Sequence, residues 1–101
     1  MDPFTRISVQ QAHEMMGSGK VAVVDVRDPA SFEREHIANA QSLNDENIKT
    51  FLNETDKEIP LICYCYHGIS SQNAALFFAE QGFKNVYSMD GGWEKWKTTY
   101  V

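Results

Sequence analysis

Residues 61–71 read LICYCYHGISS, and this stretch decides how the whole chain is interpreted. Leu61 to Tyr64 is a short apolar run that is typical of a strand. The residues that follow from Ser70, SSQNAALFFAEQG, predict a helix with serine as its N-cap and Gly82 just past its last turn. Cys65 is therefore expected where the strand stops, in a tight loop that leads into the N-terminus of a helix.

This position favours an activated thiol at Cys65. Ligands of open α/β sheets bind at the carboxyl ends of the strands, and helix N-termini and runs of backbone N–H groups attract anions. An ordinary cysteine has a pKa of about 8.5 and is only about 3% thiolate at pH 7. Lowering the pKa by about 2 units would make roughly three quarters of it thiolate. Cys65 is the candidate nucleophile, and a buried structural thiol is the alternative.

Length and charge narrow the class of protein. The 101 residues are enough for one small domain, and we expect a single domain over residues 1–101. The formal net charge of −5 argues against nucleic acid or an anionic membrane as a partner. The chain has no apolar run long enough to span a membrane, and its N-terminus does not resemble a signal peptide.

The two cysteines indicate a reducing compartment. Cys63 and Cys65 are two positions apart, so a disulfide between them would be strained. Two cysteines do not make a disulfide framework, and we expect a cytoplasmic protein. With no second Cys/His pair at zinc-finger spacing, we expect no metal and no cofactor.

The rest of the chain alternates between strand and helix patterns, which predicts an α/β fold with a mostly parallel sheet and helices on both faces. The expected strands cover residues 4–7, 21–26, 41–43, 61–64 and 85–88. Helices are expected after a capping box at Ser8–Gln11, after the cap Asp28 with Pro29, after Asn44 or Asp45, after Ser70, and over residues 93–100. Because residues 74–79 are apolar all round, we expect the helix that contains them to be covered on most sides.

Four motifs in this order resemble the rhodanese family of sulfurtransferases, and together they cover nearly the whole chain. They are Asp25-Val-Arg27, the segment FEREHIANA at residues 32–40, the loop CYHGIS at residues 65–70, and the segment DGGWEKW at residues 90–96. The size of the chain and its CYHG loop are most similar to the short, single-domain thiosulfate sulfurtransferases of bacteria.

The resemblance implies a rhodanese-like fold with a sheet of five mostly parallel strands. It also implies a reaction in two steps, in which Cys65 takes the sulfane sulfur from thiosulfate as a persulfide. Cyanide or an acceptor thiol, such as that of thioredoxin, then removes this sulfur. The substrate-binding residues would be those of the loop, Tyr66, His67, Gly68, Ile69 and Ser70. Their backbone N–H groups would cradle the anion, and Gly68 would allow a positive φ.

The sequence departs from the family pattern at a few positions. Glu35 and Asn39 occupy positions where the family has glycine, although asparagine tolerates the left-handed region. Residues 65–71 contain neither Lys nor Arg, which predicts weak binding of the anionic donor unless Arg27 or Arg34 reaches the site.

Other residues allow two interpretations each. His67 is either a proton donor or an exposed loop histidine, and sulfite needs little help from an acid to leave. His36 is expected to satisfy backbone groups rather than to bind a ligand. Asp25 and Arg27 are expected to be a structural ion pair that supports the loop rather than substrate ligands.

Two other classes of protein compete with a sulfurtransferase. Cysteine phosphatases and related arsenate reductases carry Cys-x5-Arg, with the arginine clamping the oxyanion, but Ser71 stands at that position here. The other class is a rhodanese-like module that binds a partner or relays sulfur with little catalysis of its own. The presence of Cys65 argues against a purely non-catalytic module.

Overall fold

The strand before Cys65, β4 (Leu61–Tyr64), lies at the centre of a five-stranded sheet with the order β1-β5-β4-β2-β3. The computed structural model describes residues 3–101, and each pair of neighbouring strands in this sheet is parallel. The other strands are β1 (Thr5–Ile7), β2 (Ala22–Asp25), β3 (Gln41–Ser42) and β5 (Val86–Met89). The α/β fold with a parallel sheet is confirmed, and strand ends differ from the expected ones by at most one residue.

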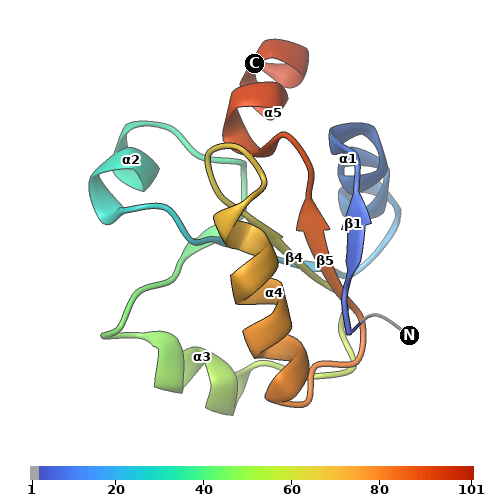
Figure 1. The fold of residues 1–101 in the computed structure, drawn as a ribbon, viewed down its shortest axis with the longest axis vertical. Helices are drawn as coiled ribbons and strands as arrows, with labels where there is room; N and C mark the ends of the chain where they lie inside the picture. The colour runs from blue at the N-terminus through green and yellow to red at the C-terminus, as the bar shows by residue number, and fades with distance from the viewer. Residues whose placement is uncertain (1–2) are drawn as a thin grey trace.

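The helices cover both faces of this sheet, as predicted. They are α1 (Val9–Ser18), α2 (Pro29–Arg34), α3 (Ile48–Glu54), α4 (Ser70–Glu80) and α5 (Gly92–Tyr100). Parallel strands must be joined by crossovers, and α2, α4 and α5 each begin a few residues after the carboxyl end of a strand. The loop between β4 and α4 consequently lies at the same end of the molecule as α2 and α5 (Figure 1).

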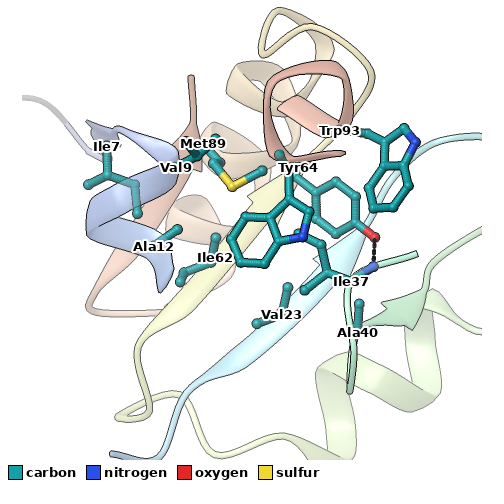
Figure 2. Packing of buried hydrophobic residues seen from close by; sticks show 11 residues of the cluster. Ile7, Val9, Ala12, Val23, Ile37, Ala40, Ile62, Tyr64, Met89 and Trp93 are labelled. Carbon is teal, nitrogen blue, oxygen red and sulfur yellow. Dashed lines mark hydrogen bonds between the residues drawn. The ribbon is translucent and has the colours of Figure 1, made fainter. Parts of the chain in front are cut away.

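Alternation of side chains along the strands divides the core into two clusters. Ile62 and Tyr64 of β4 belong to a cluster with α1 and α5, which also contains Trp93 and Trp96 (Figure 2). Leu61 and Cys63 face the other way, into a cluster with α3 and α4. Cys63 is completely buried there, and burial raises the pKa of its thiol above the ordinary range. Cys63 is thus a packed, un-ionised thiol, as is usual for a cysteine inside a buried strand.

The helix caps agree with the sequence in two cases and differ in two. The capping box of Ser8 with Gln11 and the cap of Asp28 on Ser31 are both present. The N-cap of α3 is Asn47 rather than Asn44 or Asp45. Asn44 instead closes the preceding turn, because its side-chain oxygen accepts from the N–H groups of Glu46 and Asn47.

The entrance to α4 also differs from the prediction. The N-cap is Ile69, without a side-chain hydrogen bond, and Ser70 is the first helical residue. The prediction that α4 is covered on most sides was wrong as well. Leu76 and Phe77 are each 38% exposed, whereas Ala75 and Phe78 are buried against the sheet. One face of α4 packs on β4 and β5, and the opposite face carries apolar side chains at the surface.

Within residues 3–101, no helix combines the length and hydropathy that a transmembrane span requires.

Candidate active site

Cys65 follows the last residue of β4, and residues 65–69 turn tightly around its side chain before α4 begins. The turn depends on Gly68, whose φ is +88°. A Cβ on Gly68 would lie 2.8 Å from the backbone nitrogen of Gly91, so a side chain would not fit without a shift of the backbone. The side chain of Gln72 donates to the carbonyl of Gly68 at 2.9 Å and ties the turn to α4. The predicted role of Gly68 in the turn is confirmed.

The sulfur of Cys65 lies at the centre of this turn and accepts backbone hydrogen bonds. The N–H groups of Gly68 and Ser71 each donate to Sγ at 3.2 Å. Burial raises the pKa of the Cys65 thiol, but hydrogen bonds from Ser71, Gly68 and His67 outweigh it, and the resulting pKa is lowered. Cys65 is only 6% exposed, so its sulfur is largely shielded from water. The hydrogen bonds from the loop, not hydration, stabilise the thiolate.

Helix α5 supports the loop from behind. Two N–H groups of its first turn, those of Trp93 and Glu94, donate to the carbonyls of Cys65 at 2.8 Å and Tyr66 at 3.0 Å. The contact is close because of Gly92, where a Cβ would lie 2.5 Å from the carbonyl oxygens of Cys65 and Tyr66. A trans peptide directs its N–H opposite to its C=O. Docking both carbonyls on α5 therefore turns the N–H groups of Tyr66 and His67 toward the other side of the loop.

Three further N–H groups of the loop are open donors. Among residues 3–101, no acceptor is found for the N–H groups of Tyr66, Ile69 and Ser70. Unpaired backbone amides in a tight turn attract anions. The loop thus has one set of N–H groups bound to the sulfur of Cys65 and a second set without an acceptor among residues 3–101.

A cavity of about 410 Å³ opens in front of Cys65. Five of its lining residues come from the loop, and the other three are Val26, Arg27 and Asp28, which follow β2. The loop residues that line it are Cys65, Tyr66, His67, Ile69 and Ser70. The structure therefore brings the sequence-predicted site residues together around one cavity, with Gly68 behind them as the turn.

The charge of Arg27 does not face this cavity freely. Its side chain is 2% exposed and forms a bidentate ion pair with Asp25, which is completely buried. The guanidinium also donates to the carbonyl of Glu35 at 2.7 Å and lies over the rings of Tyr66 and Trp93. The pair joins β2 to the segment after α2, which agrees with the structural role expected for it.

Tyr66 lines the cavity and is bound to α2. Its hydroxyl is hydrogen-bonded to that of Ser31, and its ring lies against Arg27. His67 is exposed at the rim of the cavity and makes no side-chain hydrogen bond within residues 3–101. Ile69 projects most, with 73% of its surface exposed. The polar groups that the loop offers near the cysteine are thus mainly backbone N–H groups, and most of its side chains are uncharged.

The residues that depart from the family pattern introduce little backbone strain in this structure. Glu35 has an extended backbone with φ −159°, which any residue adopts, and its carbonyl accepts from Arg27. Asn39 has φ +71°, in the left-handed region that asparagine tolerates. His36 is exposed, stacks on Phe32 and bonds the carbonyl of that residue through Nδ1, so it has the structural role expected.

Sequence analysis missed a buried pair of hydroxyl groups, one of which belongs to a residue whose N–H holds the sulfur. Ser71 and Ser88 are completely buried, and their hydroxyl groups are 2.8 Å apart. Ser71 had been considered only as the residue that replaces a phosphatase arginine. The sequence does contain one signal for Ser88, because it is a polar residue in the otherwise apolar strand β5. Asp25 is a similar polar residue in β2. No group of three or more His, Cys, Asp or Glu side chains in the described part of the chain is placed to hold a metal ion.

Comparison with known proteins agrees with this geometry. The family model for the rhodanese-like domain matches residues 8–99, and the chain belongs to the rhodanese family. It is 49% identical over 100 residues to a protein named thiosulfate sulfurtransferase GlpE from Ectopseudomonas mendocina, covering 99% of this chain and 91% of the relative. It is 48% identical to a protein of the same name from Shewanella oneidensis, covering 95% of each chain.

Solved structures show the same fold at lower sequence identity. The rhodanese-like domain of the Anabaena sp. Alr3790 protein superposes with a TM-score of 0.84 at 20% identity, covering 99% of this chain and 76% of that one. A rhodanese-like domain protein from Staphylococcus aureus gives a TM-score of 0.80 at 22% identity, with 92% and 91% of the two chains covered. The resemblance stated from four motifs is therefore confirmed for family and fold.

Proposed function

We propose that this protein is a thiosulfate sulfurtransferase with Cys65 as its nucleophile. The observation that carries the proposal is the sulfur of Cys65, which accepts hydrogen bonds from two N–H groups at 3.2 Å and lines a cavity of about 410 Å³. Relatives that are 45–49% identical over nearly the whole chain carry the name thiosulfate sulfurtransferase, which supports the same activity here.

In the first step, the thiolate of Cys65 attacks the outer sulfur of thiosulfate. A Cys–S–S bond forms, the S–S bond of thiosulfate breaks, and sulfite leaves with the bonding electrons. The negative charge of the thiolate moves to the terminal sulfur of the persulfide. The open N–H groups of Tyr66, Ile69 and Ser70 would hold the oxygens of the donor and then this terminal sulfur.

In the second step, cyanide or a thiolate attacks the terminal sulfur, and Cys65 leaves as a thiolate. The products are thiocyanate or a new persulfide, and no electron is gained or lost by the pair of steps. A low pKa of Cys65 favours both steps of the reaction, because the thiolate is the nucleophile in the first step and the leaving group in the second. A thiol protein such as thioredoxin would be an acceptor of the required chemistry.

Neither step needs a side chain that donates a proton. Sulfite and the acceptor persulfide both leave as anions, so His67 at the rim is proposed to line the cavity rather than to act as an acid. Residues 1–101 are proposed to work as one rhodanese domain. Both cysteines are free thiols, which supports a reducing compartment such as the cytoplasm.

Intact-protein mass spectrometry tests the proposal directly. After treatment of the fully reduced protein with thiosulfate, we expect a species heavier by one sulfur atom, and cyanide or dithiothreitol should reverse the change. The Cys65→Ser variant, treated in parallel, should keep its mass. An unchanged mass in the reduced wild-type protein would contradict the sulfurtransferase function and would favour a module that only binds a partner.

A further inference from the structure

A second cavity adjoins the one in front of Cys65. It has a volume of about 300 Å³ and lies between helix α4 and the segment that leads from β3 into α3. Its lining is mostly apolar and consists of Val26, Leu43, Asn44, Asp45, Ile48, Ala74, Phe77 and Phe78. Because Val26 lines both cavities, the two meet at this residue.

One face of α4 also runs from the first cavity into the second. Ser70, in the first turn of the helix, lines the cavity of Cys65, whereas Ala74 and Phe77 line the second cavity. These three positions are spaced i, i+4 and i+7, which places them on one side of a helix. The two cavities therefore form one groove along α4 that leads away from the reactive sulfur, and we call it the α4 groove.

The far part of the α4 groove does not suit the sulfur donor. Phe77 is 38% exposed there, and Ile48 on the opposite side is half-buried. Asp45 is exposed at its edge and forms no ion pair in the part of the chain that the structure describes. Thiosulfate is a small dianion, which neither apolar surface nor an acidic side chain attracts. The groove is thus suited to a different and larger reactant.

We propose that the α4 groove binds an extended segment of a protein acceptor that carries an apolar side chain two or three residues from its reactive thiol. The inference rests on the proposed function, because it concerns the second step. The acceptor thiolate bonds to the terminal sulfur of the persulfide, the bond from this sulfur to Sγ of Cys65 breaks, and Cys65 keeps the electron pair. Since Cys65 is only 6% exposed, the residues beside the acceptor thiol must enter the opening of the cavity.

The length and charge of the groove define this segment. From Ser70 to Phe77 the helix rises about 10 Å, a distance that an extended chain covers in about three residues. A leucine at that distance from the thiol would bury apolar surface against Phe77 and Ile48. An acidic residue there would be repelled by Asp45. Cyanide is too small to use the groove, so the groove should discriminate among protein acceptors only.

Short peptides test the inference on the wild-type protein. The Cys65 persulfide is formed with thiosulfate, excess donor is removed, and the loss of sulfur to each peptide is followed by intact mass. The peptides are acetylated and amidated, with one cysteine, a leucine two or three positions before or after it, and alanine elsewhere. We expect the best of them to react about five- to tenfold faster than the all-alanine peptide at low concentration. Glutamate in place of that leucine should make the reaction slower than with alanine.

Two neighbouring residues of α4 supply matched variants. Phe77→Ser removes part of the apolar wall and should abolish the preference for leucine. It should leave persulfide formation and the removal of sulfur by cyanide unchanged. Leu76→Ser changes a residue that is equally exposed, at 38%, but lines neither cavity, and it should keep the preference.

The outcomes separate this inference from the proposed function. Equal rates with the leucine and alanine peptides, in a wild-type protein that forms the persulfide, would overturn the inference alone. Failure to form the persulfide would overturn both. Size-exclusion chromatography tests a second copy of the chain as the occupant, and we expect wild type and Phe77→Ser to elute alike. A wild-type dimer that Phe77→Ser dissociates would assign the groove to self-association and overturn the inference.

Discussion

The hydroxyl of Tyr66, in the loop that follows Cys65, is hydrogen-bonded to the hydroxyl of Ser31 on helix α2. The ring of Tyr66 also covers Arg27, so this side chain points toward α2 and not over the sulfur. The loop itself supplies no positive charge, and backbone N–H groups must bind the donor. Saturation by thiosulfate is therefore expected to be weak, in the millimolar range at the upper end of ordinary KM values.

A positive charge at position 69 should strengthen binding. Ile69 is 73% exposed at the rim of the cavity, so Ile69→Lys places an ammonium near the anion without loss of packing. At about 5 Å and an effective dielectric of 20–80, one charge contributes roughly 1–3 kcal/mol per unit of charge, before entropy and screening. We expect a KM for thiosulfate that is about three- to tenfold lower at low salt, and a smaller gain at high salt.

Tyr66→Arg is the informative comparison for Ile69→Lys. From the sequence alone, an arginine at position 66 is expected to lower KM, because it adds a positive charge to a loop that has none. Its guanidinium would replace the bond to Ser31 and face the charge of Arg27, so we now expect a smaller gain or a loss. A wild-type KM in the low micromolar range, measured from initial rates, would contradict binding by backbone dipoles alone.

Replacing each cysteine in turn should separate their roles. Cys65→Ser should abolish sulfur transfer, because a serine hydroxyl does not ionise in the same turn. Cys63→Ala should retain most of the activity, since burial holds the pKa of Cys63 high and its side chain packs against α3 and α4. Truncation of this small buried side chain should lower stability by about 1 kcal/mol. Equal loss of transfer in both variants would indicate a dithiol mechanism.

The lowered pKa of Cys65 should appear in the pH dependence of stability. In the folded protein Cys65 loses its proton at a lower pH than in the unfolded chain. The thiolate then stabilises the folded state above the unfolded pKa of about 8.5, and this contribution is lost as pH falls through the folded pKa. Wild type should therefore gain in Tm relative to Cys65→Ser as pH rises toward 8.5. Cys63, whose raised pKa acts in the opposite direction, is common to both proteins and cancels.

A substitution at Gly92 should damage the site from behind. Gly92 has φ +57°, and a Cβ there would lie 2.5 Å from backbone atoms of Cys65 and Tyr66. Gly92→Ala should cost about 2–4 kcal/mol of unfolding free energy and most of the activity. Gly17→Ala is the matched control, because nothing lies within 4 Å of a Cβ on this residue of α1, and it should stabilise by about 0.5–1 kcal/mol. Urea denaturation measures both, and equal effects would contradict the role of Gly92.

The placement of Cys65 could be predicted because its signals are local. An apolar run, a short loop with Gly68 and a helix-forming segment specify a strand, a turn and a helix in that order. The exposure of Leu76 and Phe77 could not be predicted in this way, since composition shows that α4 is apolar but not how many neighbours cover it.

Contacts between segments that are distant in the sequence could not be predicted from the sequence either. The hydrogen bond between Ser71 and Ser88 joins α4 to β5, and the support of the loop needs Gly92 to meet Cys65. Both contacts join positions that are far apart in sequence and are specified by the packing of the whole sheet. The N-cap of α4 was misassigned for a related reason. The first turn of this helix directs the N–H of Ser71 to the sulfur of Cys65, and nothing in the sequence around Ser70 indicates this contact.

The docking of α5 on the loop has a consequence for the order in which the protein becomes reactive. The carbonyls of Cys65 and Tyr66 are held by N–H groups of residues 93 and 94. A nascent chain that has emerged only to residue 90 would carry the cysteine but not these donors, so its loop would lack the orientation that lowers the pKa. The thiol should stay close to the reactivity of an ordinary cysteine during synthesis and become a strong nucleophile only when the closing helix folds against it.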